Sequence, residues 1–449
     1  MTQREALDLL KTGANVFLTG AAGSGKTYLL NQYIEYLRKN SIVVGITAST
    51  GIAATHMGGT TIHSWSGMGI RDTLHEKDIA ELQKKQYLRK HFNRTNVLII
   101  DEISMLHAGQ LDMVDMLCRA FKRHNVPFGG MQIVMCGDFF QLPPIQRKKD
   151  DSLFASEEAS KTNFVTESNI WGEMNAQICY LDEQHRQDDL AFLRVLNDIR
   201  SGEVSETTVE YLSERLNKET EGYSKPTRLF THNTDVDAIN NTHIEALPGE
   251  AHEYFMTGRG SLPLNQMLRK SCLAPEKLIL KIGAQVMFVK NNYDGGYVNG
   301  TLGEVIGFDK HDGPLVRTFT GREIVVGQAS WEVKEENVEL AAISQIPLRL
   351  AWAITVHKSQ GMSLDGAEID LSRSFVPGQG YVALSRVRNL AGLKLMGMNQ
   401  MALTVNEQVA EMDKNFRKLS DEAVLYLDGL GKEKKIQMQE DFLAHLKKS

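Results

Sequence analysis

A glycine-rich stretch near the start of the chain constrains the fold more than any other feature of the sequence. Val16–Leu18 is a short apolar run typical of a buried strand. It leads into Gly-Ala-Ala-Gly-Ser-Gly-Lys-Thr at Gly20–Thr27, and apolar residues then recur at helical spacing as far as Leu37. A strand, a glycine loop and a helix in this order distinguish a phosphate-binding P-loop from a chance glycine turn. The sequence therefore predicts an α/β domain that binds a nucleoside triphosphate.

The residues of this loop suit a triphosphate and a magnesium ion. Glycines expose backbone N–H groups to phosphate oxygens, and the N-terminus of the following helix adds a partial positive charge. Lys26 can reach the β- and γ-phosphates, and the Thr27 hydroxyl can bind Mg²⁺. Gln3, upstream in a helical pattern, is either an exposed side chain or a contact to the adenine edge, which favours ATP. The predicted cofactors are ATP and Mg²⁺, and the predicted nucleotide contacts here are Gln3, Gly20, Ala22, Gly23, Ser24, Gly25, Lys26, Thr27 and Tyr28.

Composition excludes several classes of protein. The chain has 449 residues, 42% hydrophobic and 24% charged, which is typical of a globular protein of about three domains. No apolar run approaches the ~20 residues that span a bilayer, and the N-terminus lacks the apolar core of a signal peptide. We therefore expect a cytoplasmic protein, associated with the nucleoid when it acts on DNA. The four cysteines show no metal-ligand spacing, and the net charge of −6 means that a nucleic acid would need a local groove.

Polar side chains follow two further strand-like runs. Val97–Ile100 is apolar and ends in Asp101 and Glu102, at the end of a strand where ligands bind in open α/β sheets. Asp101 can hold Mg²⁺, and Glu102 can orient and deprotonate the attacking water. Gln141 follows the next predicted strand and can sense the γ-phosphate, whereas Phe139 and Phe140 are expected in the core.

Two arginines are candidates for an arginine finger, a side chain that stabilises the γ-phosphate. Arg186 follows a predicted strand at Ala176–Leu181, and Arg386 follows a helix start at Gly378. A surface arginine is the alternative for each. Neither position alone decides between the two roles.

Three other segments could contact a nucleic-acid strand. The stretch Ala48–Ala54 and Gly58–Trp65 is dense in small and hydroxylated residues, which suit backbone phosphates. His63 and Trp65 could stack on bases, although a core position is as reasonable for Trp65. The Asn299-Gly300-Thr301 turn either contacts a phosphate or closes a plain hairpin.

The chain also shows its domain organisation. Asp72–Arg94 is polar and helical in period, and it interrupts the first α/β pattern as a small surface insertion. A second α/β unit starts near Thr227 and resumes after Ala251–Ile346, where β patterns and turn signals predict an inserted all-β barrel. Ala351–Ser359 is predicted to be helical, and the chain is helical and charged from about Asn406.

These motifs together resemble those of the Pif-type DNA helicases, a superfamily 1B branch of the two-RecA-domain helicases that also holds the RecD-like enzymes. Ser104–Arg123 with Pro127–Gly130 resembles a signature of this family, whereas His185 stands where the family typically has an aromatic residue. The resemblance covers nearly the whole chain and implies a short bacterial form with the helicase core only. The matching motifs in chain order are Gly20–Thr27, Thr47–Ala54 with Gly58–Ser64, Asp101–Met105, Gly137–Pro144, Arg186-Gln187, Thr355–Gly361 and Tyr381–Arg386.

The resemblance implies an α/β fold with two RecA-like P-loop domains, a small wedge insertion and an inserted SH3-like β-barrel domain. The first RecA-like domain would span residues 1–180, with the wedge insertion at about 70–94. The second would span residues 181–250 and 346–410, with the SH3-like domain at 251–345 between its two parts. A C-terminal helical segment would span 411–449.

The resemblance also implies a set of functional residues. The catalytic residues would be Lys26, Glu102, Gln141, Arg186 and Arg386. The metal would be held by Thr27 and Asp101, and Gly361 would join Gln141 and the two arginines among the nucleotide contacts. The DNA-binding residues would be Thr60, His63, Pro143, Asn299, His357 and Lys358.

The activity that the resemblance implies is an ATP-dependent DNA helicase that moves 5′ to 3′ along single-stranded DNA. It would unwind duplexes, and also G-quadruplexes and RNA–DNA hybrids, in DNA repair, recombination, replication or telomere-like genome maintenance. Its partners would be single strands and single-to-double-strand junctions, with no membrane, and it would be a monomer in solution. One alternative is a RecD-like helicase, against which Ser104–Arg123 argues. Another is an ATP-dependent DNA clamp or switch that does not unwind, and the sequence does not decide against it.

Overall fold

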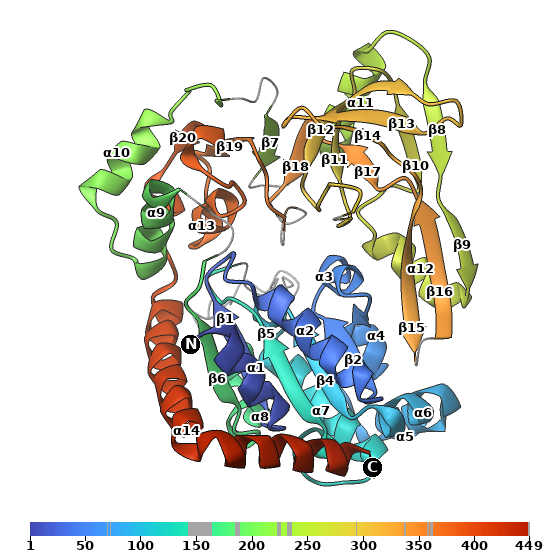
Figure 1. Cartoon of the computed structure of the whole chain (residues 1–449), viewed down its shortest axis with the longest axis vertical. Coiled ribbons are helices and arrows are strands. Elements are labelled where there is room, and N and C mark those ends of the chain that lie inside the picture. Colours follow the sequence, from blue (N-terminus) through green and yellow to red (C-terminus); the bar gives the residue numbers. More distant parts are fainter. Residues whose placement is uncertain are drawn as a thin grey trace, which may run out of the picture. The chain divides into compact units, whose positions relative to one another are not determined.

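The computed structural model describes residues 1–69, 71, 73–141, 164–184, 189–221, 226–230, 236–292, 294–335, 338–356, 359 and 362–447. The chain divides into two compact units, Met1–His185 with Glu411–Ser449 and Arg186–Ala410 (Figure 1). The first unit therefore contains both ends of the chain. Among the described residues, no helix is long and apolar enough to cross a membrane.

The first unit is built on a parallel sheet of six strands in the order β3-β2-β4-β5-β1-β6. Apolar strands such as β1, β4 and β5 are buried along their whole length, as expected when helices cover both faces of a parallel sheet. The predicted strands at Val16–Leu18 and Val97–Ile100 are confirmed. The strands are β1 (Val16–Gly20), β2 (Val44–Ala48), β3 (Thr60–Thr61), β4 (Val97–Asp101), β5 (Gln132–Cys136) and β6 (Gln177–Leu181).

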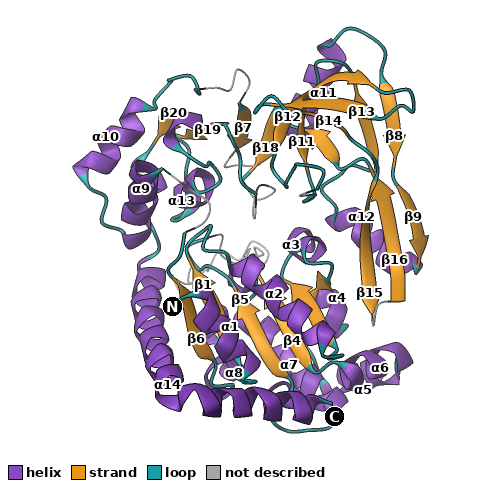
Figure 2. Ribbon diagram, in the orientation of Figure 1, coloured by secondary structure: helices purple, strands orange, loops and turns teal. Residues whose placement is uncertain are grey.

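Helices flank the sheet of the first unit (Figure 2). Leu10 of α1 and Leu30 of α2 share a core with Ile99 of β4. The predicted helical insertion at Asp72–Arg94 contains α5 and α6, which contact α7. The helices of this unit are α1 (Gln3–Lys11), α2 (Lys26–Lys39), α3 (Gly51–His56), α4 (Ile62–Ser66), α5 (Glu76–Lys84), α6 (Gln86–Arg94), α7 (Ala108–Lys122), α8 (Asn169–Glu173) and α14 (Glu407–Leu446).

The long C-terminal helix α14 packs on the first unit. It has 40 residues and bends at Gly431, where φ is 70° and ψ is 167°. Before the bend, Phe416 lies in an aromatic cluster with Phe17 of β1, Phe139 and Trp171. After the bend, Leu446 belongs to the core that α1 and α2 share with the sheet.

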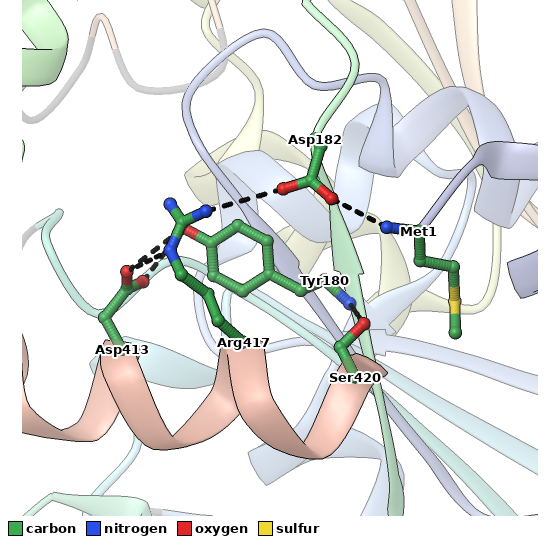
Figure 3. A network of polar contacts seen from close by, with 6 residues as sticks. All are labelled: Met1, Tyr180, Asp182, Asp413, Arg417 and Ser420. Atoms are coloured by element: carbon green, nitrogen blue, oxygen red, sulfur yellow. Dashed lines mark hydrogen bonds and ion pairs between the residues drawn. The ribbon is translucent and has the colours of Figure 1, made fainter. Parts of the chain in front are cut away.

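Polar contacts also attach α14 to β6 (Figure 3). The Tyr180 N–H donates to the Ser420 hydroxyl at 3.0 Å, and the Arg417 guanidinium lies 4.1 Å from the centre of the Tyr180 ring. Asp182, just past β6, accepts from Arg417 at 3.5 Å and from the Met1 amino group at 2.7 Å. The segment that leaves β6 is therefore held by residues from both ends of the chain.

The second unit contains a parallel sheet of four strands in the order β18-β7-β19-β20. β18 and β7 are neighbours in this sheet but far apart in the sequence, because the β-rich segment lies between them in the chain. The elements of this part are α9 (Leu190–Ser201), α10 (Glu206–Glu214), β7 (Thr227–Phe230), β18 (Ala353–Thr355), β19 (Ala367–Leu371), α13 (Gln379–Leu384) and β20 (Leu393–Met398).

In the described part of the chain, three antiparallel sheets, together with two helices, form the segment between β7 and β18. One has five strands in the order β14-β13-β12-β11-β17, one has three in the order β15-β16-β9, and one pairs β10 with β8. The elements are α11 (Val236–Ala246), β8 (His252–Phe255), β9 (Thr257–Gly260), α12 (Leu262–Ser271), β10 (Lys277–Leu280), β11 (Gln285–Phe288), β12 (Leu302–Phe308), β13 (Pro314–Thr318), β14 (Glu323–Val325), β15 (Ala329–Glu335), β16 (Val338–Gln345) and β17 (Leu348–Leu350).

Two local predictions were wrong. The helix predicted at Ala351–Ser359 is replaced by strand β18, because Ala353–Thr355 pairs in parallel with β7 and Asn240 bonds both backbone groups of Ala353. Tertiary pairing here overrides local periodicity. The segment predicted to be all-β also contains helix α12. The predicted domain borders remain a prediction.

Candidate functional site

The polar residues predicted around the nucleotide lie at one edge of the first sheet. β5 lies between β1 and β4, and the register pairs Leu18 with Cys136 and Ile100 with Met135. The loops that leave these three parallel strands therefore start side by side. They are the P-loop, the Asp101-Glu102 pair and the loop that carries Gln141.

The P-loop has the backbone that its glycines predict. Gly20, Gly23 and Gly25 have φ values of 142°, 90° and 82°, where side chains are rare. A Cβ on Gly20 would lie 2.6 Å from the Leu181 carbonyl oxygen and 2.9 Å from the Ser24 hydroxyl. Gly25 is also the residue that precedes α2, so the free N–H groups of this helix face the loop.

Two side chains of the loop could bind a phosphate. The Lys26 ammonium donates to the carbonyl oxygens of Gly20 at 2.9 Å and Ala21 at 3.0 Å. The Ser24 hydroxyl is buried and has no hydrogen-bond partner among the described residues. A buried hydroxyl without a partner is costly, so the loop fits an added anion.

The other predicted nucleotide contacts of this unit lie around the same loop. Gln3 donates from its amide to the Ser24 carbonyl at 3.4 Å, which attaches the start of α1 to the P-loop. Ala22 is buried, whereas Thr27 and Tyr28 are exposed in the first turn of α2. The structure thus brings Gln3 and the P-loop together.

Asp101 lies buried at the end of β4. Burial raises the pKa of Asp101, while the Cys136 side chain, the Glu102 N–H and the Lys26 charge favour its carboxylate. The Glu102 N–H bond to Asp101 Oδ1 is 2.8 Å long. A buried carboxylate close to Lys26 fits a hard divalent cation bound by oxygen.

Glu102 has a strained backbone that its neighbours maintain. Its φ of 52° and ψ of 43° are left-handed, which is uncommon for a residue other than glycine. The Ser49 hydroxyl donates to the Glu102 carbonyl at 2.6 Å, and the Ser49 N–H donates to the Asp101 carbonyl at 3.0 Å. The motifs of the sequence did not indicate this role for Ser49. Its position directly after β2, at the same edge of the sheet, was the feature that could have indicated it.

Asp138 is a second residue that sequence analysis missed. It is fully buried, and its two carboxylate oxygens accept from the Phe140 N–H at 3.2 Å and the Gln141 amide at 3.3 Å. Asp138 forms an Asx-turn with the backbone two residues later. An aspartate directly after a predicted strand was the feature of the sequence that could have indicated this turn. Phe139 and Phe140 are buried, which confirms their predicted core positions.

Trp65 and His63, in the hydroxyl-rich stretch of the first unit, lie in different surroundings. Trp65 is 4% exposed and lies edge-on to Phe92, with ring centres 4.8 Å apart, so it is a core residue. His63 Nε2 lies 3.0 Å from the Gln110 amide nitrogen at the start of α7, and Thr60 pairs with Thr47 in the sheet.

The remaining predicted residues belong to the second unit or lie outside the described residues. Arg386 is 1% exposed, and its guanidinium donates to the Val382 carbonyl at 3.0 Å and the Ser385 hydroxyl at 2.9 Å. The Asn299 N–H donates to Asn291 Oδ1 at 2.8 Å. The predicted residues outside the described part are Pro143, Arg186, His357, Lys358 and Gly361.

Comparisons with known proteins agree with this arrangement. Residues 2–210 match the family model of the PIF1-like helicase, and residues 264–308 match that of the 2B domain of DNA helicase Pif1. The chain is 42% identical to the ATP-dependent DNA helicase Pif1 of Psychrobacter sp., over 99% of this chain and 75% of that protein. It is 38% identical to the ATP-dependent DNA helicase PIF1 of Xenopus laevis, over 91% of this chain and 63% of that protein. It thus spans less than two thirds of the Xenopus protein.

Solved structures give the same result. Pif1 of Bacteroides sp. in complex with ADP-AlF4 superposes with a TM-score of 0.78 at 30% identity, over 93% of this chain and 96% of that one. Bacteroides Pif1 bound to single-stranded DNA superposes with a TM-score of 0.61 at 30% identity, over the same shares. These likenesses confirm the predicted α/β fold class with its additional small sheets. The chain belongs to the PIF1-like helicase family.

Proposed function

We propose that this chain is an ATP-dependent DNA helicase that moves 5′ to 3′ along a single strand and unwinds the duplex ahead of it. The observation that carries the proposal is the convergence of the P-loop, Asp101-Glu102 and the Gln141 loop on adjacent strand ends in a member of the PIF1-like helicase family. The enzyme hydrolyses ATP, and the RecD-like and clamp alternatives are not favoured by its relatives.

ATP would be held by the P-loop in this proposal. The N–H groups at the start of α2 would bind phosphate oxygens, and Lys26, now bonded to the carbonyls of Gly20 and Ala21, would bind the β- and γ-phosphates. Ser24 gains a partner for its buried hydroxyl. We also assign Gln3 to contact the adenine base, which its bond to the Ser24 carbonyl supports.

Oxygen donors beside the loop suit Mg²⁺. Thr27 presents a hydroxyl at the first turn of α2, and Asp101 a buried carboxylate at the end of β4. The ion, when bound, neutralises charge on the phosphates. Because burial raises the pKa of Asp101, a nearby cation favours the carboxylate form that the site needs.

Hydrolysis requires a base at a fixed position. Glu102 is held in its left-handed conformation by Ser49, and we assign it to accept a proton from the attacking water. Gln141, positioned by Asp138, would sense the γ-phosphate. We further assign Arg186 and Arg386 to stabilise that phosphate from the second RecA-like domain, and Gly361 to contact the nucleotide.

We propose single-stranded DNA and single-to-double-strand junctions as partners. The support is the family and the Bacteroides Pif1 structure bound to single-stranded DNA. The proposed contacts are Thr60, His63, Pro143, Asn299, His357 and Lys358. Unwinding of G-quadruplexes and RNA–DNA hybrids, a monomeric state in solution and a cytoplasmic location complete the proposal, together with the domain borders given above.

DNA-stimulated ATP hydrolysis tests the assignment of the site. The wild-type chain should hydrolyse ATP faster when single-stranded DNA is added. Lys26→Ala should abolish hydrolysis, whereas Glu102→Gln should bind ATP normally and hydrolyse it at least ~100-fold more slowly, which is the low end for a lost general base. Retained hydrolysis in either purified variant would overturn the roles given to these residues.

A further inference from the structure

A run of cations without acids lies in the helical insertion of the first unit. Residues 82–94 contain five lysines and arginines and no aspartate or glutamate, although the whole chain has 50 basic and 56 acidic residues. These five cations are Lys84, Lys85, Arg89, Lys90 and Arg94. Positive charge is therefore concentrated on α6 and the turn before it, within an acidic chain.

The C-terminal end of α7 extends this charge. Arg119 is neutralised, because it pairs with Asp115 at 2.7 Å and with Glu173 at 2.9 Å. Lys122 and Arg123 follow without an acidic partner among the described residues. We call α6 and the end of α7 at Lys122 and Arg123 the cationic surface.

A cavity of about 440 Å³ lies in this surface, between α6 and α7. The side chains that line it are polar or basic except for one phenylalanine. They are Gln83, Arg89, Asn93, Phe121, Lys122 and Arg123.

The cavity is built from fixed parts. The Gln83 amide donates to the Ala120 carbonyl at 2.7 Å, and the Lys122 ammonium donates to the Thr95 carbonyl at 2.6 Å. Below them, the rings of Phe92 and Phe121 stack with centres 4.3 Å apart. The helical insertion is therefore held firmly against α7, and the cavity does not depend on a ligand for its shape.

Two guanidinium groups in the cavity lack counter-charges. Arg89 and Arg123 are exposed, and within the described residues neither side chain has a hydrogen bond or an ion pair. A guanidinium carries five N–H donors in a planar fork that matches phosphate oxygens. Two such groups beside one cavity repel each other, and an anion between them would relieve that repulsion.

Helix dipoles do not explain the pattern fully. Cations at the last turn of a helix are favourable, which accounts for Arg94 and Lys122. Arg89 and Lys90 lie before the last turn of α6, whose first turn has no acidic residue. The helix dipole therefore does not account for these two cations.

One end of the cationic surface lies apart from His63, a proposed single-strand contact. His63 contacts Gln110, in the first turn of α7, whereas Arg123 directly follows the last residue of the same helix. Thirteen residues of α-helix span about 20 Å. The Arg123 end of the cationic surface therefore lies about a helix length from the contact of His63 with Gln110, whereas α6 itself packs on Trp65.

We propose that the cationic surface binds the phosphate backbone of double-stranded DNA, with Arg89 and Arg123 holding phosphate oxygens at the cavity. The proposal rests on the proposed helicase function, since the duplex is the part of a tailed substrate that is not yet unwound. A rigid cavity with unpaired guanidinium groups fits the regular phosphate positions of a duplex, and the surface needs no contact to bases.

The test is duplex binding by Arg89→Gln/Arg123→Gln. Affinity for a blunt duplex is measured by fluorescence anisotropy from 0.05 to 0.3 M salt, on the full chain. Loss of two phosphate contacts lowers the salt slope by about 1.8 and the affinity at 0.15 M salt by about 30-fold. Affinity for a short single strand and single-strand-stimulated ATP hydrolysis should stay within about twofold of wild type.

Two control variants separate charge position from charge count and from folding. Lys432→Gln/Lys434→Gln removes two exposed charges from α14 and should leave duplex binding unchanged. Arg89→Lys/Arg123→Lys keeps both charges and should keep most of the salt slope.

The outcomes distinguish this inference from the proposed function. If Arg89→Gln/Arg123→Gln binds the duplex with the wild-type slope, the inference is wrong while the helicase proposal stands. If the α14 variant loses as much affinity, the contact is not at this surface, and the inference is also wrong. Failure of the wild-type chain to hydrolyse ATP with DNA would instead contradict the proposed function.

Discussion

Replacing Phe416 by alanine tests how tightly the C-terminal helix is joined to the nucleotide-binding sheet. Phe416 is 6% exposed, and its ring centre lies 5.2 Å from that of Phe17 and 5.9 Å from that of Phe139. Phe17 lies three residues before Gly20 of the P-loop, and Phe139 two residues before Gln141. The ring therefore supports the strand before the P-loop and the loop that carries Gln141.

The expected loss of stability follows from burial and from the ring contacts. Truncation of a buried phenylalanine costs about 3–5 kcal/mol, and we expect a value near 4 because three aromatic neighbours lose their partner together. At about 2–4 °C per kcal/mol for a unit of this size, the first unit should melt some 8–16 °C lower.

Thermal unfolding by calorimetry, with and without ATP, measures this change. The matched control is Leu425→Ala, on the same helix but 71% exposed, which should cost less than about 0.5 kcal/mol. Phe416 and the P-loop both belong to the first unit. ATP should therefore raise the melting temperature of the same transition that Phe416→Ala lowers. Equal melting temperatures for the two variants would refute the argument that α14 is part of the folded core.

Three further predictions concern the first unit. Asp138→Asn should slow ATP hydrolysis about tenfold or more and leave nucleotide affinity within about threefold, because it replaces the carboxylate that accepts from Phe140 and Gln141, neither of which belongs to the P-loop. Steady-state kinetics and a nucleotide-binding titration measure both parameters, and an equal fall in both would contradict this prediction. His63→Ala should weaken single-strand binding at an unchanged melting temperature, whereas Trp65→Ala should destabilise the buried core by about 3–5 kcal/mol, as DNA-binding and melting curves compare. The Thr2 N–H bond lowers the pKa of Glu5, so Glu5→Ala should cost about 1 kcal/mol near pH 7, and this cost should vanish as the pH falls through the lowered pKa; a cost that persists at pH 3 would contradict it.

The sequence was most informative where local physics decides the structure. Glycines at Gly20–Gly25 are needed for the backbone of the P-loop, and the apolar run before Asp101 is a strand buried on both faces. Both features depend on neighbouring residues only, so spacing and residue type predicted them. The order of Thr27, Asp101 and Gln141 along the chain then predicted that they gather at one edge of a sheet.

The sequence was less informative where distant segments decide. β18 was predicted to be a helix because its pairing with β7 and with Asn240 has no local signal. The contact of Phe416 with Phe17 joins opposite ends of the chain, and no periodicity indicates it. Ser49 and Asp138 hold the proposed catalytic residues by single hydrogen bonds, which become visible only when the strands lie side by side.

Strand separation by the purified chain tests the central claim most directly. Two duplexes of the same sequence, one with a 5′ and one with a 3′ single-stranded tail, are incubated with ATP and Mg²⁺, with Lys26→Ala as the control. The account predicts separation of the 5′-tailed duplex only, by the wild-type chain only. Separation from the 3′ tail would contradict the proposed direction, and ATP hydrolysis stimulated by DNA without separation of either duplex would contradict the helicase itself.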